Sequence, residues 1–183
     1  PDALQNTYRG RINFETGVVK LGGLDSVADK LFNAKRIIIT GCGTAWHAGL
    51  VGEYMLEQYC RIPTEVEYAS EFRYRNPIID KDDVVILISQ SGETADTRAA
   101  MKEAQRLGAT TIGIVNVVGS TIAREVDCGT YIHAGPEIGV ASTKAFTCQL
   151  MSLALITLMI AKHKGTLSDA QLKDIAAELN SLP

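Results

Sequence analysis

This sequence has few aromatic side chains and no excess of positive charge, and both features argue against a nucleic-acid partner. Aromatic residues make up only 6% of the 183 residues, too few for a platform on which nucleic-acid bases stack. The 18 lysines and arginines are outnumbered by 21 acidic residues, so the net charge is -3 and no basic face is indicated. We therefore expect a compact, mildly acidic, soluble domain with no nucleic-acid partner.

Paired cysteines are also missing. The four cysteines, at positions 42, 60, 128 and 148, form no C-x-x-C pair, and no histidine stands near them at metal-ligand spacing. The first ten residues, PDALQNTYRG, lack the charged and then apolar pattern of a secretory signal. Reduced thiols in a cytoplasmic protein are the simplest interpretation. We expect neither a metal site nor a cofactor.

A single long run without charge lies between Lys144 and Lys162, and its length is near the short end of a membrane-spanning helix. Four polar side chains interrupt it, and no second run of this kind occurs. A helix buried on all sides, in a core or a subunit interface, has the same composition. We predict a core helix and no membrane partner. The polar positions are Thr147, Gln149, Ser152 and Thr157.

Apolar runs alternate with helical patterns along the rest of the chain. The runs within 36–40, 82–88 and 110–116 are continuously apolar, which is typical of parallel strands covered on both faces. Strands joined through helices form right-handed crossovers, so the predicted fold class is α/β, a three-layer α/β/α sandwich with a mainly parallel sheet. The tail helix has Ser168 as its N-cap. The predicted strands are 36–40, 64–68, 82–88, 110–116 and 129–133, and the predicted helices are 24–34, 44–60, 70–75, 94–107, 120–126, 145–161 and 167–182.

The predicted strand 82–88 leads into the stretch LISQSGETADT, residues 87–97. This stretch has several uncharged hydrogen-bond donors just after the strand, where α/β proteins bind ligands. Ser89, Ser91 and Thr94 supply hydroxyls and Gln90 supplies an amide. The following helix points its free N–H groups at the same loop, which suits a phosphate. We expect Glu93 to point away, because its carboxylate would repel a phosphate. The pattern favours a phosphorylated small molecule, although each hydroxyl could instead only cap the helix.

Better-known nucleotide loops fit the sequence poorly. No G-x-x-x-x-G-K-[ST] stretch is present, so a nucleoside-triphosphate loop of that kind is excluded. GCGTAWHAG, residues 41–49, has Trp46 where a dinucleotide loop needs its third glycine. Cys42 is close to His47 in sequence but lacks a base with an orienting partner, so we interpret it as a small buried thiol. Lys144 could face an anion or only extend along apolar surface.

Four motifs, in order along the chain, resemble the isomerase part of the glutamine–fructose-6-phosphate amidotransferases: GCGTAWHAG, ASEFRYR, LISQSGETADT and EIGVASTKAFTCQL. SQSGET alone is typical of the wider SIS (sugar isomerase) family, whereas the second and fourth motifs are far more specific. The resemblance covers nearly the whole chain. It implies the SIS fold, a five-stranded parallel sheet flanked by helices. It also implies a part in making glucosamine-6-phosphate and glutamate from fructose-6-phosphate and glutamine, in hexosamine biosynthesis.

The resemblance also implies ligand contacts that spacing alone does not. The donors between residues 89 and 94 would hold the sugar phosphate, the first loop would line the sugar, and a later loop would close the other side. Position 45 is alanine where the family often has a serine, and a lost direct hydrogen bond would remove about 0.5–1.5 kcal/mol of binding. The implied substrate-binding residues are Cys42, Gly43, Thr44, Ser89, Gln90, Ser91, Thr94, Val140, Ala141 and Ser142.

The resemblance further implies that this chain carries no catalytic residue. In the family, the general-base glutamate, the ring-opening histidine and the Schiff-base lysine lie in a second SIS repeat and the C-terminal tail, and nothing here matches them. The glutaminase half is also unmatched, so we expect a fragment that is inactive alone, from a parent enzyme that is a homodimer or larger. We predict a linker over 1–23, the SIS domain over 24–165, and over 166–183 a helix that leads to the second repeat.

Two other functions stay open. SIS domains also serve as non-catalytic sugar-phosphate sensors in transcription regulators, but residues 1–35 contain no recognisable helix-turn-helix segment. A different sugar-phosphate isomerase built on one SIS repeat would need its own catalytic pair. Glu137 and His133 are the only nearby glutamate and histidine. The specific motifs favour the amidotransferase over both.

Overall fold

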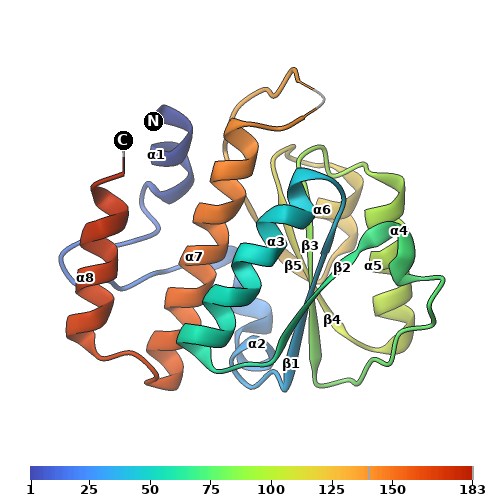
Figure 1. The fold of residues 1–183 in the computed structure, drawn as a ribbon, viewed down its shortest axis with the longest axis horizontal. Helices are drawn as coiled ribbons and strands as arrows, with labels where there is room; N and C mark the ends of the chain where they lie inside the picture. The colour runs from blue at the N-terminus through green and yellow to red at the C-terminus, as the bar shows by residue number, and fades with distance from the viewer. Residues whose placement is uncertain (140, 183) are drawn as a thin grey trace.

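The computed structural model describes residues 1–139 and 141–182, and a central sheet organises them (Figure 1). Its strands are all parallel and lie in the order β2-β1-β3-β4-β5. The middle strands are buried along their whole length, as their continuously apolar sequences require. The predicted five-stranded parallel sheet is therefore confirmed. The strands are β1 (Arg36–Gly41), β2 (Thr64–Tyr68), β3 (Asp83–Ser89), β4 (Thr110–Val115) and β5 (Cys128–Tyr131).

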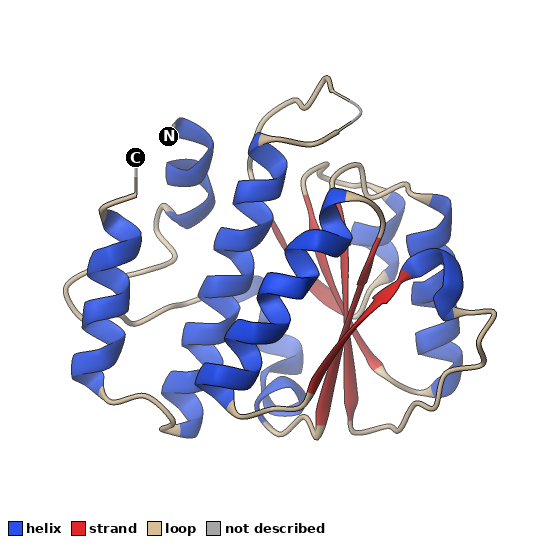
Figure 2. Ribbon diagram, viewed as in Figure 1, coloured by secondary structure: helices blue, strands red, loops and turns tan. Residues whose placement is uncertain are grey.

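Helices cover both faces of the sheet and complete the predicted three-layer sandwich (Figure 2). One face carries the larger apolar core, which includes the buried side chains of α3 and α7. The other face carries a smaller core built around Phe72, Met101 and Ile122. The helices on the first face are α1 (Asp2–Tyr8), α2 (Ala28–Phe32), α3 (Thr44–Met55), α7 (Lys144–Lys164) and α8 (Asp169–Asn180), and those on the second are α4 (Ala69–Phe72), α5 (Ala95–Leu107) and α6 (Thr121–Glu125).

Helix α7 is the long uncharged segment, and it is the one helix in the described ranges that is long and apolar enough to span a membrane. Within the structure, 67% of its most apolar 18-residue window is buried. Leu153 and Ile156 on this helix are fully buried in the larger core. Gly52 of α3 faces α7 so closely that a Cβ atom there would lie 3.0 Å from the Leu153 side chain. This packing agrees with the predicted core helix.

Several element boundaries differ from the predictions. Residues 22–32 form a 3-10 helix, η1 (Gly22–Val27), followed by the short α2, rather than one amphipathic helix. Helix α3 ends at Met55 and continues as a π-helical turn, η2 (Leu56–Cys60). The first 23 residues, predicted to be a linker, include helix α1, and the hydroxyl of Thr7 on it donates to the Ile132 carbonyl at 2.5 Å. A seven-residue helix with one buried side chain has too few turns to show a periodic pattern.

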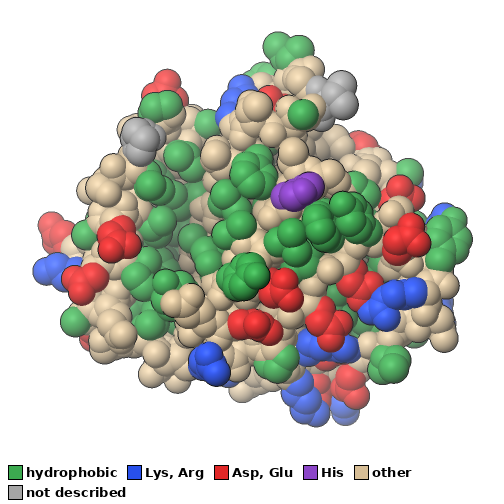
Figure 3. Space-filling model, viewed as in Figure 1, with side chains coloured by type: hydrophobic (Ala, Val, Ile, Leu, Met, Phe, Trp, Pro, Cys, Tyr) green, Lys and Arg blue, Asp and Glu red, His purple; other side chains and the backbone are tan. Residues whose placement is uncertain are grey.

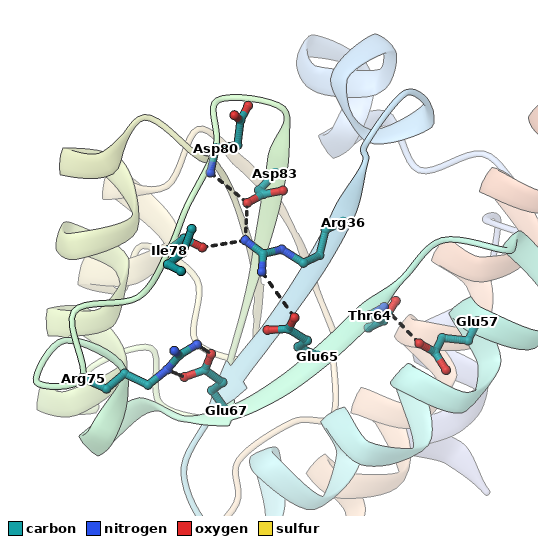
Figure 4. Close-up of polar contacts among 9 residues, drawn as sticks. All are labelled: Arg36, Glu57, Thr64, Glu65, Glu67, Arg75, Ile78, Asp80 and Asp83. Atoms are coloured by element: carbon teal, nitrogen blue, oxygen red, sulfur yellow. Dashed lines mark hydrogen bonds and ion pairs between the residues drawn. The ribbon is translucent and has the colours of Figure 1, made fainter.

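A polar network anchors the edge of the sheet where β1 and β3 begin (Figure 4). Arg36 donates from Nη2 to Asp83 Oδ2 and to the Ile78 carbonyl, each at 2.6 Å, and from Nη1 to Glu65 at 3.3 Å. The Asp83 side chain is only 4% exposed, so its charge depends on these partners. Its hydrogen bond to Arg36 raises the pKa of the guanidinium. The network therefore fixes the ends of two central strands opposite the edge where ligands bind in such sheets.

Candidate functional site

A cavity of about 420 Å³ lies beyond the carboxyl ends of β1 and β3. The chain passes from β1 outward to β2 and then returns to the other side of β1 as β3, so the strand order reverses here. Open α/β sheets bind ligands at this kind of reversal, because the loops that follow the two strands diverge and leave a crevice. The loop after β1, the loop after β3, the loop before α7 and one side chain of α7 line the cavity.

The cavity brings together nine of the ten residues that were expected to bind the substrate. The tenth, Val140, lies outside the described residues. Three segments that are far apart in the sequence therefore converge on one space. The nine are Cys42, Gly43, Thr44, Ser89, Gln90, Ser91, Thr94, Ala141 and Ser142.

The loop after β3 is held by its own hydroxyls. The Gly92 N–H donates to Ser89 Oγ at 3.0 Å, and Ser89 Oγ lies 3.0 Å from Thr94 Oγ1. The Glu93 N–H donates to Ser91 Oγ at 3.1 Å. Because Ser89 and Ser91 each accept a backbone proton, the protons of these hydroxyls are left to donate, directly or through Thr94. The loop can thus present hydroxyl donors to an anion while its own backbone is satisfied.

Thr94 stands at the N-cap of α5, yet its side chain caps nothing in that helix. Its hydroxyl is turned toward Ser89 instead. The first N–H groups of α5 therefore have no side-chain cap at this position and can donate to a bound anion. The alternative in which the hydroxyls only cap the helix does not describe Thr94, whereas Ser91 does make a local turn contact.

Glu93 points away from the cavity, as predicted. Its Oε1 accepts the N–H of Thr121 at 2.7 Å, at the start of α6. Hydrogen bonding to the side chain and then to the backbone of Thr121 lowers the pKa of the Glu93 carboxyl. Gly92 lets the loop turn this way, since its φ is +66° and a Cβ atom would lie 2.0 Å from Ser120 Oγ. The acidic side chain is thereby tied to a neighbouring helix, and the cavity wall stays uncharged.

The loop after β1 forms the other wall. Gly43, with φ of 57°, precedes α3, and Thr44 is the first residue of that helix. His47 Nδ1 lies 2.9 Å from the Gly43 carbonyl, so the ring nitrogen that donates there is Nδ1. Cys42 is half-buried and faces the cavity, with Thr97 Oγ1 at 4.0 Å from its sulfur. The interpretation of Cys42 as a small buried thiol is therefore corrected in part: the residue packs against the smaller core but is only half-buried, and it lines the cavity.

The dinucleotide alternative gains no support from this loop. Trp46 stacks on Tyr68 with ring centroids 4.3 Å apart and planes 12° apart. The indole thus fills the position where a dinucleotide loop needs a glycine for close helix packing.

Electrostatically, none of the side chains that line the cavity within the described ranges is charged. Helices α3 and α5 both begin at the cavity, and a helix N-terminus carries about half a positive charge. Neutral donors and two helix ends together suit a phosphate. Within residues 1–139 and 141–182, no group of three or more histidine, cysteine or acidic side chains could hold a metal ion.

A second cavity of about 550 Å³ shares Gln90 with the first and contains both His133 and Glu137. Glu137 Oε2 accepts the N–H groups of Thr143 and Ala145 at 3.2 and 3.1 Å, so its carboxylate caps the start of α7. Burial, and the nearby charge of Arg11, lower the pKa of His133. Because the Glu137 carboxylate already accepts these two N–H groups, His133 and Glu137 fit a catalytic role less well than the sequence alone suggested.

Sequence reasoning missed Gln149, which lines the first cavity from α7. Its signal was visible as a polar position inside an uncharged run, but we used that position only to argue against a membrane helix. Ala45 and Ile88 add apolar wall, and Gly139 completes the lining. Lys144, the cation we considered for an anion, is exposed and is not among the lining residues.

The family model of the SIS domain matches residues 30–159, and the chain therefore belongs to the SIS domain family. Over all 183 residues it is 56% identical to the glutamine–fructose-6-phosphate aminotransferase (isomerizing) of Bacteroides thetaiotaomicron and also 56% identical to that of Chlorobaculum tepidum. The solved C-terminal domain of glucosamine-fructose-6-phosphate aminotransferase from Francisella tularensis is 41% identical, with a TM-score of 0.90. That match covers 98% of this chain and 50% of the solved one. The chain spans about 30% of the length of the two curated relatives.

Proposed function

We propose that this chain is the fructose-6-phosphate-binding part of a glutamine–fructose-6-phosphate aminotransferase, in amino-sugar biosynthesis. The observation that carries the proposal is the convergence of nine expected contact residues on one cavity at the strand reversal. The 56% identity over the full chain to two curated enzymes of that name supports the choice of substrate. The ligands would be fructose-6-phosphate and the product glucosamine-6-phosphate.

The phosphate end would lie against Ser89, Ser91 and Thr94 and the first turn of α5. Hydroxyl protons and helix N–H groups would share its negative charge without a lysine or arginine. The sugar would extend toward Cys42 and Thr44 on the opposite wall. Residues 140–142 would close over it from the loop before α7.

The acid–base chemistry of the reaction would come from elsewhere in the enzyme. No residue of this chain matches the family's catalytic glutamate, histidine or lysine, so we propose that the chain binds the sugar but does not isomerise it. The segment 1–23 would serve as a linker, and the helix over 166–183 would lead from the SIS domain at 24–165 to a second SIS repeat. A sugar-phosphate sensor would also bind without turnover. The names of the two curated relatives make a sensor the weaker alternative.

We propose a homodimer or larger assembly for the parent enzyme, working in the cytoplasm without nucleic acid, membrane or cofactor. Figure 3 shows apolar side chains gathered over α3 and α7 on one face of the molecule. Val51 and Tyr54 on α3 are exposed, Tyr54 at 74%, and Tyr68 at the end of β2 is 41% exposed. An apolar patch of this kind on a soluble domain typically marks an interface.

Isothermal titration with fructose-6-phosphate, glucosamine-6-phosphate, inorganic phosphate and NAD tests the proposal. The two hexose phosphates should bind, and the double variant Ser89→Ala, Thr94→Ala should lose at least about tenfold in affinity, the equivalent of one to two hydrogen bonds. Incubation with fructose-6-phosphate and ammonia should yield no glucosamine-6-phosphate.

The control variant is Ser168→Ala, which removes a hydroxyl that caps α8 far from the cavity in sequence and leaves the cavity lining intact. It should bind hexose phosphates as the unmodified chain does. Binding of NAD alone would instead support a dinucleotide site. If the double variant bound hexose phosphates with unchanged affinity, the loop after β3 would not be the phosphate-binding site. Turnover by this chain alone would contradict the proposal that the catalytic residues lie elsewhere in the enzyme.

A further inference from the structure

Gln149 is the most unusual polar side chain in the molecule. It lies on α7 and is 1% exposed, with both ends of its amide buried. Neither Nε2 nor Oε1 has a hydrogen-bond partner within residues 1–139 and 141–182. Buried amides are almost always paired, because an unpaired donor or acceptor loses its hydrogen bonds to water without replacement. The side chain lines the 420 Å³ cavity, so a ligand there can reach it.

The position of Gln149 separates it from the phosphate-binding loop. Helix α5, which begins at that loop, packs on one face of the sheet, and α7 packs on the other (Figure 2). Gln149 therefore reaches the cavity from the opposite helix layer. A ligand whose phosphate lies at the start of α5 would have to extend its carbon skeleton across the strand ends to meet this amide.

The chemistry of the amide selects the part of the ligand that can satisfy it. Nε2 donates and Oε1 accepts, so pairing both ends requires groups that accept and donate. A phosphate dianion offers acceptors only and would leave Oε1 unpaired. Sugar hydroxyls do both. A sugar with several hydroxyls can therefore pair both ends of this amide at once, which a phosphate cannot.

We propose that Gln149 is a specificity residue that binds hydroxyl groups on the sugar portion of the ligand and so distinguishes a sugar phosphate from phosphate alone. The inference rests on the proposed sugar-phosphate function of the same cavity and adds a contact on the α7 side. Gln149 would bind the substrate without taking part in proton transfer.

The test compares the unmodified chain with Gln149→Leu, which has similar volume and no polar atoms. Affinity for fructose-6-phosphate should fall about tenfold, as expected for one or two lost hydrogen bonds, whereas affinity for inorganic phosphate should stay within about twofold. Thermal stability should not fall, because the variant removes a buried unpaired amide. Gln149→Met should behave in the same way, which guards against a folding defect in the leucine variant.

The matched control is Ser152→Ala. Ser152 lies on the same helix, is 1% exposed, and its Oγ also has no partner within the described ranges, but it does not line the cavity. It should change affinity for neither ligand. In the unmodified chain, the side-chain amide NMR signal of Gln149 should shift with fructose-6-phosphate and not with inorganic phosphate.

Two results would overturn the inference while leaving the proposed function in place: unchanged fructose-6-phosphate affinity in both Gln149 variants, or an equal loss for sugar phosphate and inorganic phosphate. Failure of the unmodified chain to bind either hexose phosphate would instead overturn the proposed function, and this inference with it.

Discussion

Single residues in the cavity combine the capacity to donate hydrogen bonds with the absence of charge. Ser89 and Ser91 satisfy the backbone of their own loop and keep protons to donate, while Thr94 leaves its helix uncapped. Glu93 is withdrawn to Thr121. Neutral donors of this kind, together with the start of a helix, suit a phosphate without a counter-charge.

The residues at the cavity were predictable where their neighbours in the sequence determine their position, and not where an element distant in the sequence contributes them. The donors of residues 89–94 follow an apolar strand and precede a helix, so their place at a strand end could be read from the sequence. The direction in which Glu93 points followed from charge alone. Gln149 could not be placed, because only the packing of α7 against the sheet turns that side chain toward the cavity.

The buried thiol of Cys60 makes the molecule sensitive to alkaline pH. Burial raises the pKa of Cys60 to about 12 from 9.0, and its sulfur donates to the Thr157 carbonyl at 3.2 Å, which only the protonated form can do. The unfolded chain therefore loses this proton first as pH rises. The stabilisation is complete below pH 9 and is lost between pH 9 and about 12, at about 1.4 kcal/mol per pH unit.

Urea denaturation between pH 7 and 10.5 measures this effect. Cys60→Ala should lower stability at pH 7, because it leaves a cavity, but should flatten the fall above pH 9. Burial also raises the pKa of Cys128 to about 12, so Cys128→Ala should flatten the fall separately. An alkaline slope that is the same in both variants as in the unmodified chain would assign the sensitivity to other groups.

At the scale of elements, the strands were the easiest part of the fold to predict and the helix boundaries the hardest. The central strands β1, β3 and β4 are continuous apolar runs, and burial on both faces leaves little freedom in where they lie. In helix α3, small residues line the contact with the sheet, whereas Val51 is 42% exposed. Ala48, Gly49 and Gly52 let the helix approach closely, which outweighs the burial of one valine. The N-cap of α8, by contrast, was predicted correctly as Ser168, and the structure adds Gln171 as its capping-box partner three residues later.

The polar network at the start of β1 and β3 should stabilise the sheet measurably. Arg36→Met would keep the aliphatic contacts but leave Asp83, 4% exposed, with the N–H of Asp80 as its remaining partner among those that Figure 4 draws. We expect a loss of about 2–4 kcal/mol in the free energy of unfolding, because a mostly buried carboxylate loses its counter-charge. Urea denaturation at pH 7 measures it.

Arg106→Met serves as the comparison for this variant. Arg106 pairs with Glu103 at 2.6 Å, but its side chain is 62% exposed, so its removal should cost no more than about 0.5 kcal/mol. Similar losses for the two arginines would mean that the buried network contributes nothing beyond an ordinary surface pair.

At the scale of the whole molecule, the candidate ligand cavity and the ion pair of Arg36 and Asp83 lie at opposite ends of the central strands. The partly buried ion pair of Arg36 and Asp83 anchors the beginnings of β1 and β3, and the loops that follow the same two strands line the uncharged cavity. Helices α5 and α7, from the two outer layers, both reach that cavity. The order of strands, and with it the point of reversal, emerges only when the chain is folded, so spacing alone could indicate two loops, and only the family resemblance implied that they face one space.

The most direct test of this arrangement is a crystal structure of the chain with fructose-6-phosphate. We predict the phosphate against the hydroxyls of Ser89, Ser91 and Thr94, with the sugar directed toward Cys42 and Gln149. A ligand bound in the second cavity, beside His133 and Glu137, would contradict the proposed site. So would a phosphate held by lysine or arginine side chains elsewhere on the surface.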